Sequence, residues 1–431
     1  MIRDRLEAAL ERIADPAGEG ARTLLTVYTE SARKEADAAD SRAREGASLG
    51  PLDGAIVSIK DLFDVAGEPT RAGSRILEDA SPALQDAPIV RRLREGGAVI
   101  IGKTNMSEFA FTGVGANPHF GTPGNPADRS RVPGGSSSGA AVAVADGMCD
   151  ISIGTDTGGS TRIPAGLCGI VGFKPSKYRI PTDGAFPLSR TLDSVGPLAR
   201  SVEDCAKADA VLAGEEPWTL EPYPVQGLKL GIAGGLPLSE LDETVSAKFT
   251  HALTVLGDAG AELSEVETPL FESMRKVNST ATIATVEAYE LHRERLADRG
   301  DDIDPFIRTR IEMGAAVPSD GYREMLGARG RLAAEMDALL TAYDALVLPT
   351  TPIVAPTLAE VSTADEFRRA NRLLLRNTEI ANFFDLCAIT LPMPGEGLPT
   401  GFMLFARRGH DRRLFRMAAA IEGELAGSRS R

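Results

Sequence analysis

The sequence contains few residues of the kinds that bind metals or form disulfides. Only four histidines occur, and none lies in the glycine- and serine-rich turns described below. His251 and His292 are too far apart in the sequence to form a metal-binding motif. Because the cysteines include no C-x-x-C pair, we expect reduced, mostly buried thiols, and neither a metal nor a cofactor. The four cysteines are Cys149, Cys168, Cys205 and Cys387.

Long apolar runs and a net positive charge are also absent. No run of 18 apolar residues occurs, so no membrane span is expected. The first ten residues, MIRDRLEAAL, lack the apolar core of a secretion signal, which favours the cytoplasm. The 47 basic and 61 acidic residues give a formal charge of −14, which argues against a broad phosphate-binding surface and against direct nucleic-acid binding.

The composition, 43% apolar and 25% charged over 431 residues, is that of a soluble enzyme. From Gly54 onward, short β-branched runs alternate with helical periodicity, which predicts an α/β fold in a single domain spanning 1–431. Residues 1–48 are expected to form two surface helices that pack on this domain, and about 270–345 a helical subdomain. Strands are predicted at 55–59, 98–101, 151–154, 169–173, 228–232, 345–348, 388–391 and 401–405, and helices at 87–95, 139–145, 202–212, 244–256, 280–297 and 322–343.

Two glycine–serine turns are the main candidates for a functional site. They are GGSSSG at 134–139 and GTDTGGS at 154–160. With no histidine in either turn, a serine nucleophile needs another base, and Lys60 at the end of an apolar strand is a candidate. Burial disfavours the charged form of lysine, so a buried Lys60 would be a base near neutral pH. The alternatives are a simple β-turn and a surface lysine.

A match to the Walker A pattern, from Gly97 to Thr104, is interpreted as accidental. Its four middle residues, AVII, form an apolar strand, whereas a phosphate cradle requires a loop of backbone N–H groups. Lys103 is instead expected at the end of that strand.

The segment GSSSG also matches the G-x-S-x-G nucleophile elbow, with Ser137 as the nucleophile. An elbow follows an apolar strand, but the preceding ADRSRVP is polar and ends in proline. This reading is therefore the weaker alternative. A flexible loop is the other alternative for an isolated tract of this composition.

The chain resembles the amidase signature family. The likeness is dense over about 50–200, in VSIKD, GGAVIIGKTNMSEFA, RVPGGSSSGAAVAVA, GTDTGGSTRIPAGLCGIVGFKP and TLDSVGP, and weaker in YDALVLPTTP and CAITLPMPGEGLPTGFML. The spacing of 24 residues between Ser136 and Ser160 agrees with the family. The resemblance implies a large mixed β-sheet with helices on both faces.

The resemblance also implies a Ser–cisSer–Lys triad. Ser160 is the expected nucleophile, Ser136 the bridging serine after a cis peptide bond, and Lys60 the base. The expected oxyanion donors are the N–H groups of Thr157, Gly158, Gly159 and Ser160. Asp156 and Arg162 are expected to form a supporting ion pair, and Ser137 to hydrogen-bond within the network.

The implied activity is hydrolysis of a small-molecule amide to an acid and ammonia or an amine through an acyl-enzyme. The substrate pocket is expected in the segments 277–329 and 353–384. The polar residues of the second segment are interpreted as solvent-facing or structural, and none is named as a binding residue. These residues are Asn371, Arg376, Asn377, Asn382 and Asp385.

Two other functions stay open. One is the amidase component of a glutamine-dependent tRNA amidotransferase, which works with a partner protein; for that role this chain is short and its carboxyl-terminal half divergent. The other is a non-catalytic scaffold, which would have been free to lose Lys60, Ser136 or Ser160, yet all three are present. A homodimer is one possible assembly.

Overall fold

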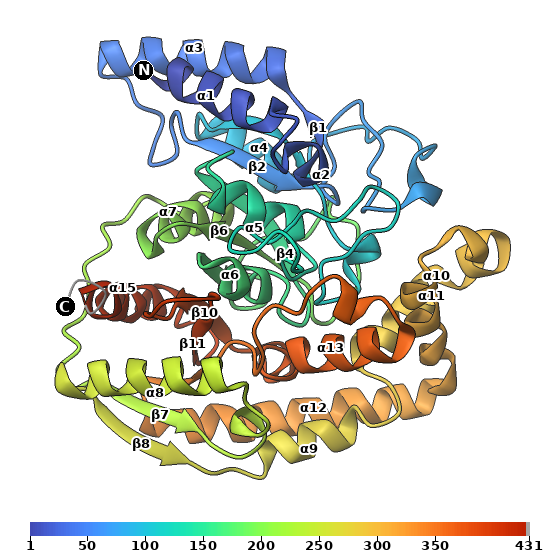
Figure 1. The fold of residues 1–431 in the computed structure, drawn as a ribbon, viewed down its shortest axis with the longest axis vertical. Helices are drawn as coiled ribbons and strands as arrows, with labels where there is room; N and C mark the ends of the chain where they lie inside the picture. The colour runs from blue at the N-terminus through green and yellow to red at the C-terminus, as the bar shows by residue number, and fades with distance from the viewer. Residues whose placement is uncertain (428–431) are drawn as a thin grey trace.

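The computed structural model describes residues 1–427, and one mixed sheet of eleven strands runs through the part it describes (Figure 1). Antiparallel pairs occupy the middle of the sheet, and parallel pairs lie toward both ends. In sheet order the strands are β1 (Leu24–Val27), β3 (Val99–Thr104), β2 (Ile56–Lys60), β4 (Ile151–Asp156), β6 (Ser194–Ala199), β5 (Val171–Lys174), β10 (Cys387–Pro392), β11 (Gly401–Ala406), β9 (Ala345–Pro349), β7 (Lys229–Ala233) and β8 (Glu262–Val266).

Fifteen α-helices surround the sheet in the described residues. They are α1 (Ile2–Ala14), α2 (Gly20–Thr23), α3 (Thr29–Glu45), α4 (Pro88–Glu95), α5 (Ser138–Ala145), α6 (Arg162–Cys168), α7 (Val202–Ala213), α8 (Glu243–Asp258), α9 (Leu270–Val277), α10 (Ile283–Arg299), α11 (Pro305–Glu312), α12 (Ser319–Leu339), α13 (Ala364–Arg376), α14 (Glu379–Phe383) and α15 (Asp411–Gly427).

Strand β2 shows how both faces of the sheet are covered. Successive strand side chains point to opposite faces. Ile56 packs in the cluster that holds α1 and α5, whereas Val57 and Ile59 pack in the cluster that holds α4, α7 and α15. A strand buried on both faces needs no polar side, which explains its apolar sequence. The predicted α/β fold, a large mixed sheet with helices on both faces, is confirmed.

The amino-terminal prediction was incomplete. Helices α1 and α3 form as expected, but β1 lies between them and pairs antiparallel with β3 at the edge of the sheet. Four residues are too few to show strand periodicity in the sequence. Several other elements were also missed: β6, β8, α2, α6, α9, α11, α14 and α15.

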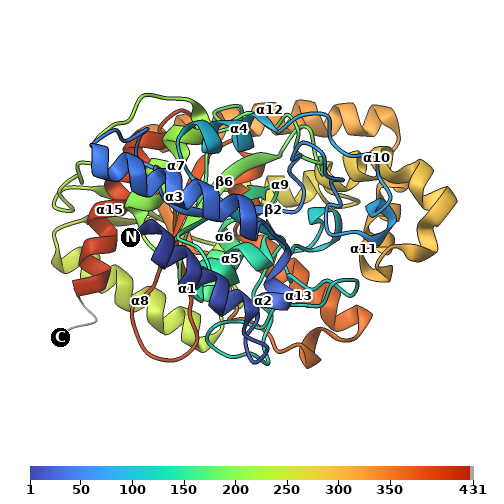
Figure 2. The ribbon, with the colours of Figure 1, turned by 90° about the horizontal axis from the view of Figure 1, so that it is seen from above.

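The two ends of the sheet carry different groups of helices. In Figure 1, α1 and α3 lie at one end, α9 and α12 at the other, and α10 and α11 at one side, where Figure 2 shows them extending from the body. Helices α9 and α12 pack in the same hydrophobic cluster as Leu346 and Leu348 of β9. The single domain, with a subdomain over about 270–345, stays a prediction.

Two sequence expectations concern the chain as a whole. All four cysteines are free and buried, as expected. In residues 1–427 no helix has both the length and the apolarity needed to cross a membrane.

Candidate active site

Lys60 and Ser136 meet in the interior of the protein. Lys60 is the last residue of β2, and Ser136 lies in the turn before α5. Both side chains are fully buried. The Nζ atom of Lys60 donates to Ser136 Oγ at 2.8 Å and to Thr155 Oγ1 at 3.0 Å. The surface-lysine alternative is therefore wrong.

Burial changes the acidity of Lys60. It lowers the pKa of Lys60 to about 7, although the negative charges of Asp156 and Asp193 act in the opposite direction. Desolvation therefore outweighs the attraction of two carboxylates. A substantial fraction of Lys60 is neutral near pH 7, and a neutral amine can accept a proton.

Close backbone packing holds the turn that carries Ser136. The Gly135–Ser136 peptide bond is cis, as the resemblance implied. A Cβ on Gly135 would lie 2.7 Å from the Cα of Gly115, so only glycine fits there. Ser136 O accepts a hydrogen bond from Ser107 N at 3.0 Å, which fixes the segment further.

Ser160 lies in the second turn, after β4, and its side chain is nearly buried. Ser137 N donates to Ser160 O at 3.3 Å, so the two serine turns are in direct contact. In residues 1–427 no hydrogen bond joins the Ser136 and Ser160 hydroxyl groups. The structure thus brings both serine turns and Lys60 together, with the direct side-chain contact between Lys60 and Ser136.

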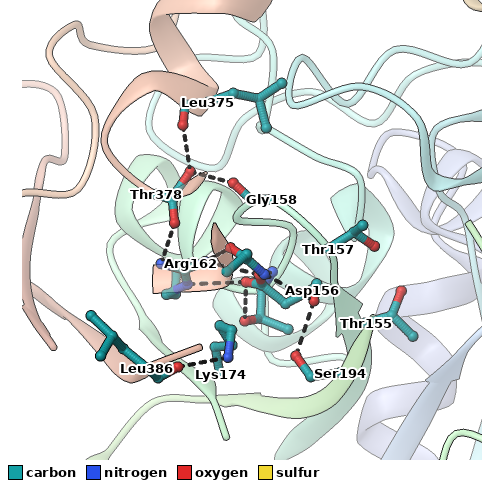
Figure 3. A network of polar contacts seen from close by, with 12 residues as sticks. Thr155, Asp156, Thr157, Gly158, Arg162, Lys174, Ser194, Leu375, Thr378 and Leu386 are labelled. Carbon is teal, nitrogen blue, oxygen red and sulfur yellow. Dashed lines mark hydrogen bonds and ion pairs between the residues drawn. The ribbon is translucent and has the colours of Figure 1, made fainter. Parts of the chain in front are cut away.

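The carbonyl groups of the second turn are held by other parts of the chain. Thr378 Oγ1 donates to Gly158 O at 2.6 Å (Figure 3), and Arg162 N and Ile163 N donate to Gly159 O. Within the described chain, the N–H groups of Gly158, Gly159 and Ser160 donate no hydrogen bond. Gly159 has φ +138°, and a Cβ there would lie 2.1 Å from Thr378 Oγ1. The turn therefore requires glycine and has unused donors.

A buried ion pair supports this turn. Arg162 Nη2 contacts Asp156 Oδ1 at 2.8 Å, and Arg162 Nε contacts Oδ2 at 3.1 Å (Figure 3). The Asp156 carboxylate also accepts bonds from Thr161 and from Asn382 Nδ2. The positive charge of Arg162 and these hydrogen bonds hold the pKa of Asp156 well below its usual range, against the effect of burial. The predicted ion pair is present.

A second lysine completes the surroundings of Asp156. Lys174 Nζ donates to the carbonyl groups of Leu386 and Pro175, each at 2.8 Å. Burial lowers the pKa of Lys174 to about 8, and the charge of Asp156 opposes this shift. The region thus contains the buried, ionised carboxylate of Asp156 and two buried lysines, Lys60 and Lys174, whose pKa values are lowered.

Comparison with known proteins decides the family. The family model described as Amidase matches residues 4–415. The chain is 36% identical to the 2-amino-5-chloromuconic acid deaminase of Comamonas testosteroni over 91% of this chain and 86% of the relative. It is also 36% identical to one of the proteins that make up the glutamyl-tRNA(Gln) amidotransferase of Acidothermus cellulolyticus, over 96% and 89% of the two chains. The chain belongs to the amidase family. It is an amidohydrolase that acts on amide C–N bonds.

The fold agrees with this assignment. A solved structure described as "Crystal structure of amidase" superposes on the chain with a TM-score of 0.88. It is 37% identical, and the match covers 99% of this chain and 96% of the other.

A pocket is lined by Ser160. Both predicted segments contribute residues to its wall, and its role as the substrate pocket stays a prediction. Two further segments, around Phe111 and around Leu188, line it as well and were missed. The contributing residues are Asn278, Thr282, Ile283, Ala284 and Arg310 from the first predicted segment and Leu375, Glu379, Asn382 and Phe383 from the second.

Asn382 was interpreted as solvent-facing or structural. It is buried and bonded to the ion pair, and it also lines the pocket. Sequence reasoning also missed Thr155 and Asp193. Asp193 Oδ1 accepts from Thr157 Oγ1 at 2.5 Å, and its position in TLDSVGP was the available signal.

The rival motifs have ordinary structural roles. Ser137 is buried, donates to Thr155 O at 3.4 Å and follows no strand, so the elbow reading is wrong. Gly102 and Lys103 lie inside β3, and no phosphate-binding loop forms there.

In the described residues no group of three potential ligands from His, Cys, Asp and Glu is arranged to hold a metal.

Proposed function

We propose that this amidase hydrolyses a carboxylic amide through an acyl-enzyme on Ser160. The observation that carries the proposal is the buried contact between Lys60 and Ser136, together with the lowered pKa of Lys60. Neutral Lys60 takes the proton of Ser136, and Ser136 takes the proton of Ser160 as its Oγ attacks the amide carbonyl. The relay then returns the proton to the leaving nitrogen, which departs as ammonia or an amine. Water then attacks the ester carbonyl of the acyl-enzyme and gives a proton to Ser136 and Lys60. The relay returns a proton to Ser160 Oγ as the acid leaves.

The second turn is the proposed oxyanion site. The N–H groups of Thr157, Gly158, Gly159 and Ser160 are the proposed donors to the oxygen of the tetrahedral intermediate. Support comes from the N–H groups of Gly158, Gly159 and Ser160, which donate no hydrogen bond within the described chain, and from the carbonyl groups of Gly158 and Gly159, whose hydrogen bonds hold the turn in place. Donors fixed before the reaction stabilise the developing charge without reorganisation.

Three residues have proposed supporting roles. Asp156 and Arg162 position the turn through the ion pair, and Ser137 joins the two turns through its N–H bond to Ser160 O. None of the three has a role in bond making or breaking in this proposal.

The variant Lys60→Ala tests the relay. We expect amide turnover near neutral pH to fall by a factor of about 10² or more, since a general base contributes on that scale. Cooperative unfolding should persist, because alanine leaves no buried charge. Unchanged turnover on a broad amide panel would contradict the lysine base.

A role as the amidase component of a tRNA amidotransferase is the second candidate, and the likeness to the Acidothermus cellulolyticus protein favours it. The chemistry at Ser160 would be the same, with glutamine as the amide. Glutamine-dependent ammonia release, together with copurification of a partner protein, would support this role. Hydrolysis of other amides by the isolated chain, with glutamine inert, would support the independent enzyme.

Cytoplasmic location and a homodimeric state are further proposals. The first rests on the amino-terminal sequence, and cell fractionation tests it. Light scattering of the purified chain tests the second, and a monomeric mass would contradict it.

A further inference from the structure

The pocket at Ser160 contains two side chains of opposite charge. Arg310 projects from α11, and Glu379 is the first residue of α14. Both are only partly exposed. No ion pair joins them in the described residues, although their charges act on each other. Their separate interactions indicate which of the two is available to a ligand.

Arg310 is already held by the protein. Its guanidinium lies over the ring of Phe111, with 4.3 Å between Cζ and the ring centroid. Its Nη1 atom also donates to Phe111 O at 2.9 Å. Stacking and a hydrogen bond fix the plane of the guanidinium. Arg310 therefore has a protein partner before any substrate binds.

Glu379 is in a different situation. In the part of the chain that the structure describes, its carboxylate accepts no hydrogen bond and forms no ion pair. The pocket that Glu379 lines has apolar side chains, such as Leu375 and Phe383, as well as polar ones, such as Thr282 and Asn382. Burial raises the pKa of Glu379 to about 7, and Arg310 opposes this shift. A carboxylate in such a pocket is unfavourable unless a donor reaches it.

We propose that Glu379 is a specificity-determining residue that accepts a hydrogen bond from an amino group on the substrate. The inference rests on the proposed amidase reaction at Ser160, because Glu379 and Ser160 line the same pocket. It assigns the substrate to amides that carry an amino or ammonium group on the acyl portion. The positive charge of Arg310 favours the ionised form of Glu379, and Arg310 is not itself the selecting group.

Matched amide pairs test the assignment. In each pair, an ammonium group replaces a methyl group of similar size: 4-aminobutanamide against pentanamide, and alaninamide against 2-methylpropanamide. The measured quantity is the ratio of kcat/KM within a pair. The wild-type chain should favour the amino member of at least one pair. The isosteric variant Glu379→Gln should lower that ratio about tenfold or more, as expected for loss of a charged hydrogen bond.

A distant carboxylate serves as the control. Glu262 is exposed on β8, and Glu262→Gln should leave the ratio unchanged. If Glu379→Gln fails to fold, a competition experiment on the wild-type chain tests the preference for amino amides. The amino amide should slow fluorophosphonate labelling of Ser160 at a lower concentration than its uncharged partner does, and equal concentrations would overturn the inference.

The outcomes are distinct. A wild-type ratio of one or below in both pairs, or a ratio that survives Glu379→Gln, overturns the role of Glu379 but leaves the amidase proposal standing. A uniform loss on all four amides would mean a purely structural role for Glu379 and also overturns the inference. Failure to label Ser160 at all would contradict the proposed function, and the inference with it.

Discussion

The pH dependence of Ser160 reactivity follows directly from the burial of Lys60. With a pKa of about 7, the neutral fraction of Lys60 is about 0.09 at pH 6, about 0.5 at pH 7 and about 0.9 at pH 8. Reactivity that needs neutral Lys60 should therefore rise about tenfold between pH 6 and pH 8 and then level off. An exposed lysine, with a pKa near 10.4, would instead give a tenfold rise per pH unit up to about pH 10.

The assay is the second-order rate of Ser160 labelling by a fluorophosphonate, followed by intact mass. This rate reports the activated nucleophile and does not require the natural substrate. Glu379 also has a pKa raised to about 7 by burial, so the profile should be repeated in Glu379→Gln. A midpoint near pH 7 in both proteins supports Lys60 as the titrating base. A rate that keeps rising beyond pH 9, or a midpoint that disappears with Glu379, would refute it.

Two further predictions concern the support of the second turn. Asp156→Asn leaves Arg162 buried without its anion, and the free energy of unfolding, measured by urea denaturation, should fall by about 3–5 kcal/mol; a change below about 0.5 kcal/mol would show that the ion pair is not needed. Gly159→Ala places a Cβ 2.1 Å from Thr378 Oγ1, so the turn must shift, and the labelling rate of Ser160 should fall more than about tenfold while the fold is retained. An unchanged rate would mean that the turn geometry does not control reactivity.

The sequence predicted the parts of the site that depend on local pattern. Lys60 ends an apolar run, and the two serine turns have unusual glycine content, so both were visible without a structure. The side chains that surround Lys60 could not be predicted from the sequence. Thr155 reaches Lys60 because β2 and β4 are parallel neighbours, and this pairing joins residues that are 95 positions apart. Long-range register of this kind leaves no trace in the local periodicity of one chain.

The pocket shows the same limit. Two of the segments that line it could be named from the sequence, but the segments around Phe111 and Leu188 and the role of each side chain could not. Asn382 and Glu379 stand three residues apart around a short helix. One is bonded to the Asp156–Arg162 pair, and the other has no hydrogen bond in the described residues. Their polar character was evident, whereas their partners depend on how α14 packs against the turn after β4.

Peptide-mapped mass spectrometry after treatment with a fluorophosphonate serine probe tests the relay of Lys60, Ser136 and Ser160 most directly. We expect a single adduct on Ser160, and Lys60→Ala should greatly slow its formation. An adduct on Ser137, or labelling of Ser160 at an unchanged rate in Lys60→Ala, would contradict this relay.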